Sequence, residues 1–213
     1  MLSRRGSVTQ TLLIVTGVLM LVLLYSLLVM VDKKQAAEDM ASGSSNQDLQ
    51  VLHTVVPFSL VDSNGETFSE ERVNTRFWIA DFMFTSCPVQ CKEMSANMSA
   101  LHKRMVDQPE VHFVSISVDP ITDTPERLRE YGASYDADTN RWHFLTGEID
   151  KIQKFSVEGL RIGTHDDPNL HSDRFVLVDH HMQIRGYYSG VDTNDLVQLE
   201  QDLRKLIAEH DHD

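Results

Sequence analysis

The chain contains two cysteines, Cys87 and Cys91, in the stretch Phe84-Thr-Ser-Cys-Pro-Val-Gln-Cys91. A thiolate is both a nucleophile and a soft metal ligand, so such a pair could form a structural disulfide, act as a redox couple or bind a metal. Residues four apart on a helix lie on one face, so both sulfurs would point the same way. The use of this pair decides what the protein does.

The spacing of the pair favours a metal over the alternatives. A disulfide here would close a very small loop and gain little stability from doing so. A thiol–disulfide oxidoreductase is compatible with the pair, because a helix N-terminus lowers a thiol pKa, but the usual redox spacing is Cys-x-x-Cys. The additional residue spreads the sulfurs and leaves room for an ion. Peroxide reduction would need a Pro-x-x-x-Thr-x-x-Cys-like setting, and the residues before Cys87 lack that proline.

A metal site needs a third ligand, and His171 is the best placed of the ten histidines. It lies near the end of the stretch 157–172, which shows little regular pattern, and irregular segments of that length are usually functional or disordered. It also precedes a predicted strand. The start of that strand would lie beside the turn at 84–91 that carries both cysteines (the cysteine turn). Two thiolates and one imidazole suit copper, whereas structural zinc takes four ligands and the chain has no further cysteine.

The elements that must position these residues follow from the apolar pattern. Near-continuous apolar runs predict strands at 77–84, 111–118, 142–146, 174–179 and 183–188. Helical spacing predicts helices that begin at Pro88, Thr124, Ile149 and Asp192. Asn64-Gly65 predicts a hairpin within 59–68. This order predicts an α/β sandwich with a mixed central sheet, and a cysteine pair between the first central strand and its helix is the thioredoxin arrangement.

An apolar segment precedes this domain. No charged residue occurs from Val8 to Val31, and at ~1.5 Å per residue such a helix spans a bilayer core of about 30 Å. The run exceeds the ~7–15 apolar residues of a cleaved signal peptide. We therefore expect one N-terminal transmembrane helix that is retained as an anchor. Arg4 and Arg5 would stay in the cytoplasm, so the domain would face the periplasm or another extracytoplasmic side.

Three regions are therefore expected: a cytoplasmic tip and transmembrane anchor at 1–32, a flexible linker at 33–50, and a thioredoxin-like copper-binding domain at 51–213. The linker is polar and contains glycine and serine. The formal net charge is -13, which repels nucleic acid, so we expect no nucleic-acid partner. The sequence has neither a phosphate-binding glycine loop nor a Gly-x-Ser-x-Gly motif, so nucleotide chemistry and serine hydrolysis have no support.

Two further features have less specific interpretations. Asp119-Pro120 and Asp123-Thr124 follow the predicted strand 111–118, and we interpret them as a strand-to-helix turn with its cap. A role in supporting the site or in docking a partner stays open, because α/β sites gather at such strand ends. We interpret His180-His181, between the last two predicted strands, as a solvated turn.

Together these motifs resemble the Sco/SenC family, membrane-anchored copper proteins of thioredoxin fold. The resemblance covers about residues 50–207 and rests on FTSCPVQC (84–91), SVDPITDTPERLREY (117–131), WHFLTG (142–147) and HSDRFVLVD (171–179). It implies that Cys87, Cys91 and His171 are copper ligands. Members of the family help to assemble the dinuclear copper centre in subunit II of cytochrome c oxidase, as copper donors, as thiol reductants, or both. Lys92 departs from the family, where many members have a second proline.

The resemblance implies a copper metallochaperone rather than an enzyme, with cytochrome c oxidase subunit II or another copper-accepting protein as its partner. The expected location is the bacterial inner membrane, in single-pass form, because no organelle-transit segment is recognisable before the apolar run. The alternative is a thiol–disulfide oxidoreductase that acts on the cysteines of a copper-accepting protein. In that case Cys87 would attack and Cys91 would resolve. His171 distinguishes the two functions, because a metallochaperone needs it as a ligand and a reductase does not.

Overall fold

The computed structural model describes residues 20, 25–26, 30, 49–162 and 172–211 of the chain. The chain divides into two units, Met1–Asp48 and Leu49–Asp213, and the second contains the cysteine motif. The predicted anchor at 8–31 and the predicted linker lie almost entirely outside the described residues. Of the helices in the described residues, none has the length and apolar character needed to cross a membrane.

One mixed sheet forms the centre of the second unit. The strands within the described residues are β1 (His53–Thr54), β2 (Ser59–Asp62), β3 (Thr67–Ser69), β4 (Phe77–Met83), β5 (Val111–Ser117), β6 (Trp142–Thr146), β7 (Arg174–Val178) and β8 (Gln183–Ser189). Their order across the sheet is β1-β8-β7-β4-β5-β6-β2-β3. β4 and β5 pair in parallel, and β7 is antiparallel to β4. The loops that follow β4 and β5 therefore meet at one edge of the sheet.

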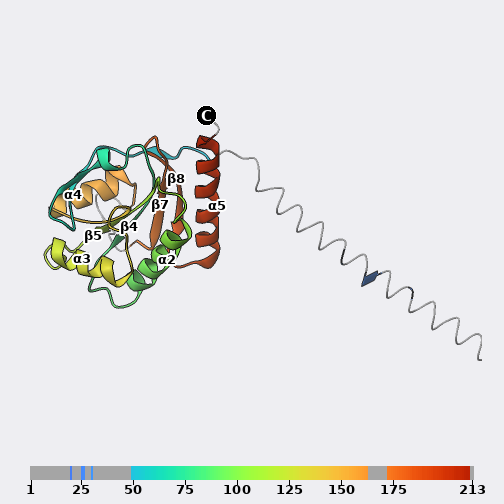
Figure 1. The fold of residues 1–213 in the computed structure, drawn as a ribbon, viewed down its shortest axis with the longest axis horizontal. Helices are drawn as coiled ribbons and strands as arrows, with labels where there is room; N and C mark the ends of the chain where they lie inside the picture. Colours follow the sequence, from blue (N-terminus) through green and yellow to red (C-terminus); the bar gives the residue numbers. More distant parts are fainter. Residues whose placement is uncertain (1–19, 21–24, 27–29, 31–48, 163–171, 212–213) are drawn as a thin grey trace, which may run out of the picture. The chain divides into compact units, whose positions relative to one another are not determined.

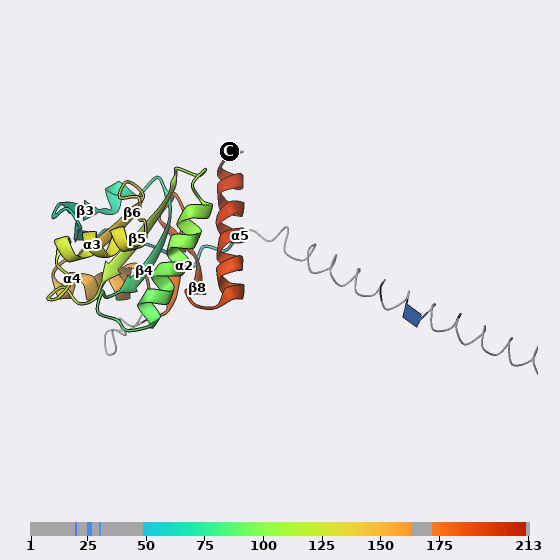
Figure 2. The same cartoon turned by 60° about the horizontal axis from the view of Figure 1, so that its bottom comes forward.

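Helices cover both faces of this sheet. They are α2 (Gln90–Arg104), α3 (Pro125–Ser134), α4 (Ile149–Lys154) and α5 (Thr193–His210), with the short 3-10 helix η1 (Glu70–Arg72) and the π-helical turn η2 (Phe155–Gly159). Side chains of α2, α3 and α5 enter one core, and those of α4 and η2 enter the other. Figures 1 and 2 show α5 at one edge of the domain, beside α2 and β8.

The central strand β4 is buried at all of its positions. Successive side chains of a strand point to opposite faces, so Ile79 and Met83 enter the core under α2 while Trp78 and Phe82 enter the other. The methionines that follow in α2 pack into the first core as well. They are Met94 and Met98, and Met105 caps the helix; each has 0% exposure. These three methionines are therefore part of the core and not surface residues.

Most predicted elements are confirmed, with two differences. The helix after the cysteine motif was predicted to begin at Pro88, and this is wrong, because α2 begins at Gln90. Cys87 closes a turn by donating its N–H to the carbonyl of Phe84, and Val89 still has a non-helical φ of -135°. The short strand β1 was not predicted. Its two residues pair with β8, which is too short a run to show alternation.

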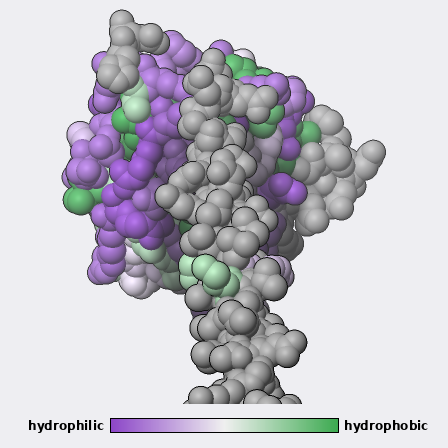
Figure 3. Space-filling view, turned by 90° about the vertical axis from the view of Figure 1, so that its right-hand side faces the viewer, coloured by the Kyte–Doolittle hydropathy of each residue, from purple (hydrophilic) through white to green (hydrophobic). Residues whose placement is uncertain are grey.

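Polar side chains dominate part of the domain surface. The side that carries α5 is mostly hydrophilic where its atoms are coloured (Figure 3). Many of the ion pairs on the described surface are exposed, including Lys103 with Asp136 at 2.7 Å. Exposed pairs of this kind add little stability. These exposed ion pairs therefore contribute little to the stability of the domain.

The N-terminus of α5 offers a test of local stability. The Asp192 side chain accepts hydrogen bonds from the N–H groups of Asn194 and Asp195, at 2.8 and 3.0 Å. We expect Asp192→Ala to lower the free energy of unfolding by about 1 kcal/mol, because two N–H groups lose their acceptor. Urea denaturation measures this loss. Asp192→Asn keeps the acceptor oxygen and should lose much less, so an equal loss in both variants would contradict the capping role.

Candidate metal centre

The cysteine pair spans the turn between β4 and α2. The N–H of Cys87 donates to the carbonyl of Phe84 at 3.2 Å. The N–H of Cys91, in the first turn of α2, donates to Sγ of Cys87 at 3.3 Å. Both thiols are free, and each cysteine is 7% exposed. The structure thus brings the two predicted site cysteines together at the edge of the core, in reduced form.

The two thiols differ in acidity. Burial opposes ionisation of Cys87, but the backbone N–H groups of Cys91, Val89 and Gln90 stabilise its thiolate, so its pKa is lowered. Burial raises the pKa of Cys91 to about 12, and its hydrogen bond to Cys87 adds to this effect. The difference follows from position, because only Cys87 faces the N–H groups at the start of a helix. Cys87 is therefore the thiol that ionises first.

This pair suits a soft metal ion such as Cu(I), which favours thiolate ligands and low coordination. His171 lies in the segment 163–171, outside the described residues, as does His165. Among the residues that are described, no group of three or more His, Cys, Asp or Glu side chains is arranged to hold a metal ion. The third predicted ligand therefore stays a prediction.

The chain that leads from His171 into β7 does lie near the cysteine turn. β7 is antiparallel to β4, with Ala80 opposite Val176, so β7 begins at the edge of the sheet where β4 ends. The backbone carbonyl of Asp173 accepts the N–H of Gly190 at 2.6 Å. The Gly190 carbonyl in turn accepts a hydrogen bond from Asn97 of α2 at 2.8 Å. The residues that follow His171 are thus tied to the helix that carries Cys91.

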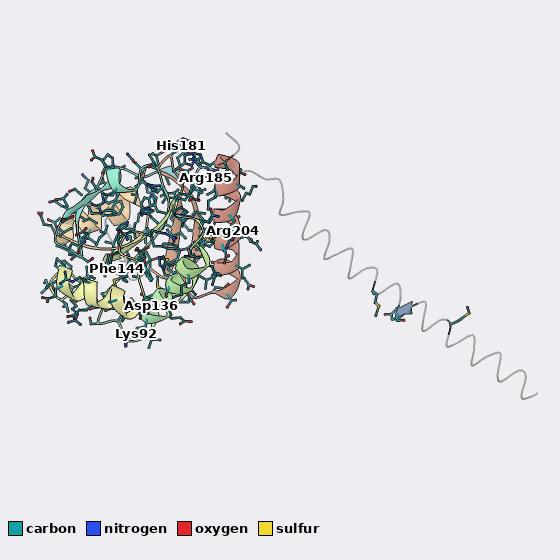
Figure 4. All side chains as sticks on the ribbon, viewed as in Figure 1. Lys92, Asp136, Phe144, His181, Arg185 and Arg204 are labelled. Carbon is teal, nitrogen blue, oxygen red and sulfur yellow. The ribbon has the colours of Figure 1, made fainter. Side chains whose placement is uncertain are left out.

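Other described histidines are remote from the motif. The His180 ring packs against the tilted rings of His181 and His210, at centroid distances of 3.9 and 4.0 Å. Its centroid lies 5.1 Å from that of Phe77 at the start of β4. A seven-residue strand is about 20 Å long, and the cysteine turn follows its other end. Figure 4 likewise shows His181 and Lys92 at opposite edges of the domain. The solvated-turn interpretation is correct for the exposed His181 but wrong for His180, which is half-buried.

A buried carboxylate anchors the cysteine turn to the loop after β5. Asp123 is fully buried and accepts the N–H of Thr85 at 3.0 Å as well as the Thr85 hydroxyl. The hydroxyl of Ser117 also donates to Asp123, at 2.6 Å. The predicted cap is confirmed at Thr124, whose hydroxyl accepts the N–H of Arg127 at 3.3 Å. The contact of Asp123 with the cysteine turn was left open by the sequence, where its only signal was its place after a central strand.

A second buried carboxyl was missed. Asp81 of β4 lies on the α2 side of the sheet, and burial raises its pKa to about 7 although the Ser115 hydroxyl donates to it at 2.6 Å. The indole N–H of Trp142 donates to the same hydroxyl at 3.0 Å. The other oxygen of Asp81 has no hydrogen-bond partner among the described residues. The charge of Asp81 contributes to the raised pKa of Cys91.

An open cleft of about 530 Å³ lies beside the cysteine turn. Its lining residues are Thr85, Thr124, Glu126, Arg127, Glu130 and Tyr131. The guanidinium of Arg127 donates to the Thr85 hydroxyl at 2.7 Å. The wall of the cleft and the cysteine turn therefore share residues, and a partner that reaches the turn can contact both.

Comparison with known proteins gives a consistent set of similarities. The "SCO1 protein homolog" of Bacillus subtilis (strain 168) is 29% identical over 158 residues, which cover 71% of this chain and 82% of that protein. A solved structure described as BsSco, "a member of the Sco family of cytochrome c oxidase assembly proteins" with a disulfide switch, is 28% identical. It covers 76% of this chain and 98% of its own, with a TM-score of 0.65.

Copper is present in a more distant structural neighbour. The structure of Arabidopsis thaliana ScoI with copper bound has a TM-score of 0.60 and 23% identity, and covers 74% of this chain and 99% of its own. At this identity the likeness shows the fold alone, which is the predicted thioredoxin-like fold. The family model SCO1/SenC matches residues 46–208, which include both cysteines and His171. The chain therefore belongs to the SCO1/SenC family.

Proposed function

We propose that this chain is a membrane-anchored copper metallochaperone for the dinuclear copper centre of cytochrome c oxidase subunit II. The observation that carries the proposal is the pair of free thiols, Cys87 and Cys91, at the turn into α2. Both would bind copper as thiolates, and the imidazole of His171 would complete the site. The copper is cargo and would pass to subunit II, or to another copper-accepting protein, by exchange of ligands.

Copper loading would depend on the redox state of the pair. Oxidation of the two thiols to a disulfide releases two electrons to an oxidant together with two protons, and a disulfide no longer offers thiolate ligands. The copper-bound Arabidopsis structure and the cytochrome c oxidase assembly role stated for BsSco support copper binding and an acceptor of this kind. Membership of the family is the link to this chain.

The proposed location is the bacterial inner membrane. The apolar run from Val8 to Val31 would be a single-pass anchor that leaves the domain on the periplasmic or extracytoplasmic side. A flexible linker at 33–50 would let the domain reach some 20–25 Å from the membrane as a random coil. The acceptor would therefore be bound to the same membrane or lie close to its surface.

A thiol–disulfide oxidoreductase is the second candidate, and the difference in acidity of the two thiols favours it. Cys87, with its lowered pKa, would attack a disulfide of the acceptor and form a mixed disulfide. Cys91 would then displace the acceptor thiol, leaving the chain oxidised and the acceptor reduced. The same residues would serve both roles, so metal binding must be measured directly.

An anaerobic Cu(I) titration of the reduced full-length chain, in a mild detergent and against a chromophoric chelator, tests the proposal. We expect one tight equivalent in the wild type. His171→Ala should weaken it at least ~10-fold, which is about 1.4 kcal/mol, because one of three ligands is lost. His165→Ala, in the same segment, is the matched control and should bind as the wild type does.

Two outcomes would contradict parts of this proposal. Equal affinity in the His171→Ala and His165→Ala chains would leave the two thiols as ligands and refute the role of His171. Absence of a tight site in a wild-type chain that still exchanges disulfides readily would favour the oxidoreductase instead.

A further inference from the structure

We propose that Asp123 is a positioning residue for the candidate metal centre, whose buried carboxylate holds the turn that carries Cys87. The inference rests on the proposed function, because it concerns the placement of a thiol that would bind copper. Asp123 is 38 residues from Thr85 in the sequence, yet it contacts that residue directly.

The contact between Asp123 and Thr85 fixes both the backbone and the side chain of Thr85. One carboxylate oxygen, Oδ2, accepts the N–H of Thr85 at 3.0 Å, and the other, Oδ1, accepts its hydroxyl. The carboxylate is 0% exposed, so water does not compete for these bonds. Hydrogen bonds to a charged acceptor are the stronger kind, and two of them on one residue restrain its orientation.

Asp123 is itself held from the sheet side and the helix side. The hydroxyl of Ser117, the last residue of β5, donates to Oδ2 at 2.6 Å. The N–H of Asp123 donates to the carbonyl of Asp119 at 2.8 Å. The guanidinium of Arg127 in α3 lies 3.8 Å from Oδ1 and donates to the Thr85 hydroxyl at 2.7 Å. The carboxylate is thus a rigid anchor and not a free side chain.

The anchor reaches Cys87 through two residues. Thr85 directly follows Phe84, whose carbonyl accepts the N–H of Cys87 at 3.2 Å and closes the turn. The preceding residue, Met83, is fastened to the same loop, because its carbonyl accepts the N–H of Val118 at 2.9 Å. The loop after β5 therefore holds the start of the cysteine turn at two points. The place of the Cys87 sulfur relative to Cys91 depends on this attachment.

A structural role alone does not explain a carboxylate at this position. A buried charge is costly, and well-packed apolar residues often stabilise a fold better. A helix cap is already supplied by Thr124. What the carboxylate adds is a set of three donors converging on two oxygens, two of them from the residue that leads into the cysteine turn. Outer-shell partners of this kind commonly tune metal affinity.

Four variants of the full-length chain test the proposal. Asp123→Asn replaces one carboxylate oxygen by an amide N–H₂ group, so at least one of the three donors to Asp123 loses its acceptor. Thr85→Val removes the hydroxyl of Thr85 and keeps the shape of its side chain. Thr85→Ser restores the hydroxyl. Asp119→Asn is the matched control in the same loop, since the Asp119 side chain accepts only from the N–H of Thr122, at 3.3 Å, among the contacts described. Each variant is checked for folding by circular dichroism.

The readouts are Cu(I) affinity by chelator competition and the rate at which a limiting alkylating reagent modifies Cys87. We expect Asp123→Asn and Thr85→Val to weaken Cu(I) binding about 10-fold or more, as changes to outer-shell partners typically do, and to change the Cys87 alkylation rate. The Thr85→Ser and Asp119→Asn chains should match the wild type in both readouts. A merely structural residue would lower the unfolding free energy without moving either readout in the folded chain.

Wild-type affinity and wild-type alkylation rates in the folded Asp123→Asn and Thr85→Val chains would overturn the positioning role. If the wild type itself lacks a tight Cu(I) site, the proposed copper-binding function is wrong, whatever the positioning role of Asp123. The alkylation rate then decides the positioning role alone: a changed rate in Thr85→Val, restored in Thr85→Ser, supports it, and an unchanged rate overturns it. If Asp123→Asn does not fold, the comparison of Thr85→Val with Thr85→Ser decides the result.

Discussion

At pH 7, in the reduced and metal-free chain, iodoacetamide is expected to alkylate Cys87 at least ~50-fold faster than Cys91. The thiolate is the reacting species, and the pKa of Cys87 is lowered while that of Cys91 is raised to about 12. Quantitative mass spectrometry of the two modified sites, after short exposure to limiting reagent, measures the ratio of the rates.

The size of this ratio follows from two opposing effects. At pH 7 a thiol with the pKa of Cys91, about 12, has about 3,000 times less thiolate than an ordinary free thiol, and the lowered pKa of Cys87 adds to this difference. A thiolate of higher pKa is intrinsically more nucleophilic, which returns about 40-fold of that advantage to Cys91. Both cysteines are 7% exposed, so access does not separate them. The difference in ionisation therefore dominates.

The urea-unfolded chain is the matched control, because it has the same two cysteines without the fold. There the helix N-terminus is lost and both thiols should react at similar rates. Equal rates in the folded chain would show that the N–H groups around Cys87 do not stabilise its thiolate. The result bears on both candidate functions, since each of them uses the Cys87 thiolate.

Much of the fold could be predicted from the sequence because its signals are local. The run from Phe77 to Met83 is buried throughout, as its near-continuous apolar pattern indicated, and this includes its one charged residue, Asp81. The hairpin around Asn64-Gly65 is confirmed, and Gly65 has the positive φ of +81° that such a turn requires. Thr124 and Asp192 cap the helices that were expected to begin there.

The features that the sequence did not predict depend on contacts between distant residues. No local pattern links Asp123 with Thr85, and the contact exists only because β4 and β5 end side by side. His210 meets His180 because α5 runs back along β8 to the start of β4. The start of α2 was misplaced because Pro88 suits a first helical position, while the turn closed by Cys87 delays the helix by two residues.

The candidate site likewise has features that could be predicted from the sequence and features that could not. The spacing of Cys87 and Cys91 predicted a shared helical face, and this is wrong, because α2 begins at Gln90 and only Cys91 lies on it. The two cysteines are nevertheless adjacent, since the N–H of Cys91 donates to Sγ of Cys87. The raised pKa of Cys91 could not be predicted, since it depends on the burial of this thiol and on its contact with Cys87. His171 was chosen for its place before a strand beside the cysteine turn, and the register of β7 against β4 agrees with that reasoning. Its role as a ligand stays a prediction.

Replacing Asp81 by asparagine is expected to stabilise the reduced, metal-free protein by ~2–4 kcal/mol at pH 8 and to change its stability little at pH 4. Burial raises the pKa of Asp81 to about 7, from an ordinary value near 4. Each pKa unit corresponds to about 1.4 kcal/mol of preference for the neutral form in the fold. Asparagine resembles the neutral acid at every pH.

The sign of the pH dependence follows from linkage. The folded state holds the proton of Asp81 more tightly than the unfolded state, so stability is highest below the unfolded pKa, at about pH 4. It is lost progressively as the pH rises to about 7 and is then constant, because the carboxyl has ionised in both states. The Asp81→Asn chain lacks this loss, so the difference between the two chains should grow from pH 4 to pH 7.

Urea denaturation of both chains between pH 4 and pH 8 measures this difference. Other groups, such as the buried His143, also titrate in the fold, but they cancel in the comparison of wild type with variant. Asp107→Asn is the matched control, because it makes the same change of carboxyl to amide at an exposed position. A difference between the Asp81→Asn chain and the wild type that does not vary with pH would mean that burial does not hold Asp81 neutral. In that event Asp81 would be negatively charged from about pH 4 upwards, and this charge would oppose ionisation of Cys91 over that whole range rather than only above about pH 7.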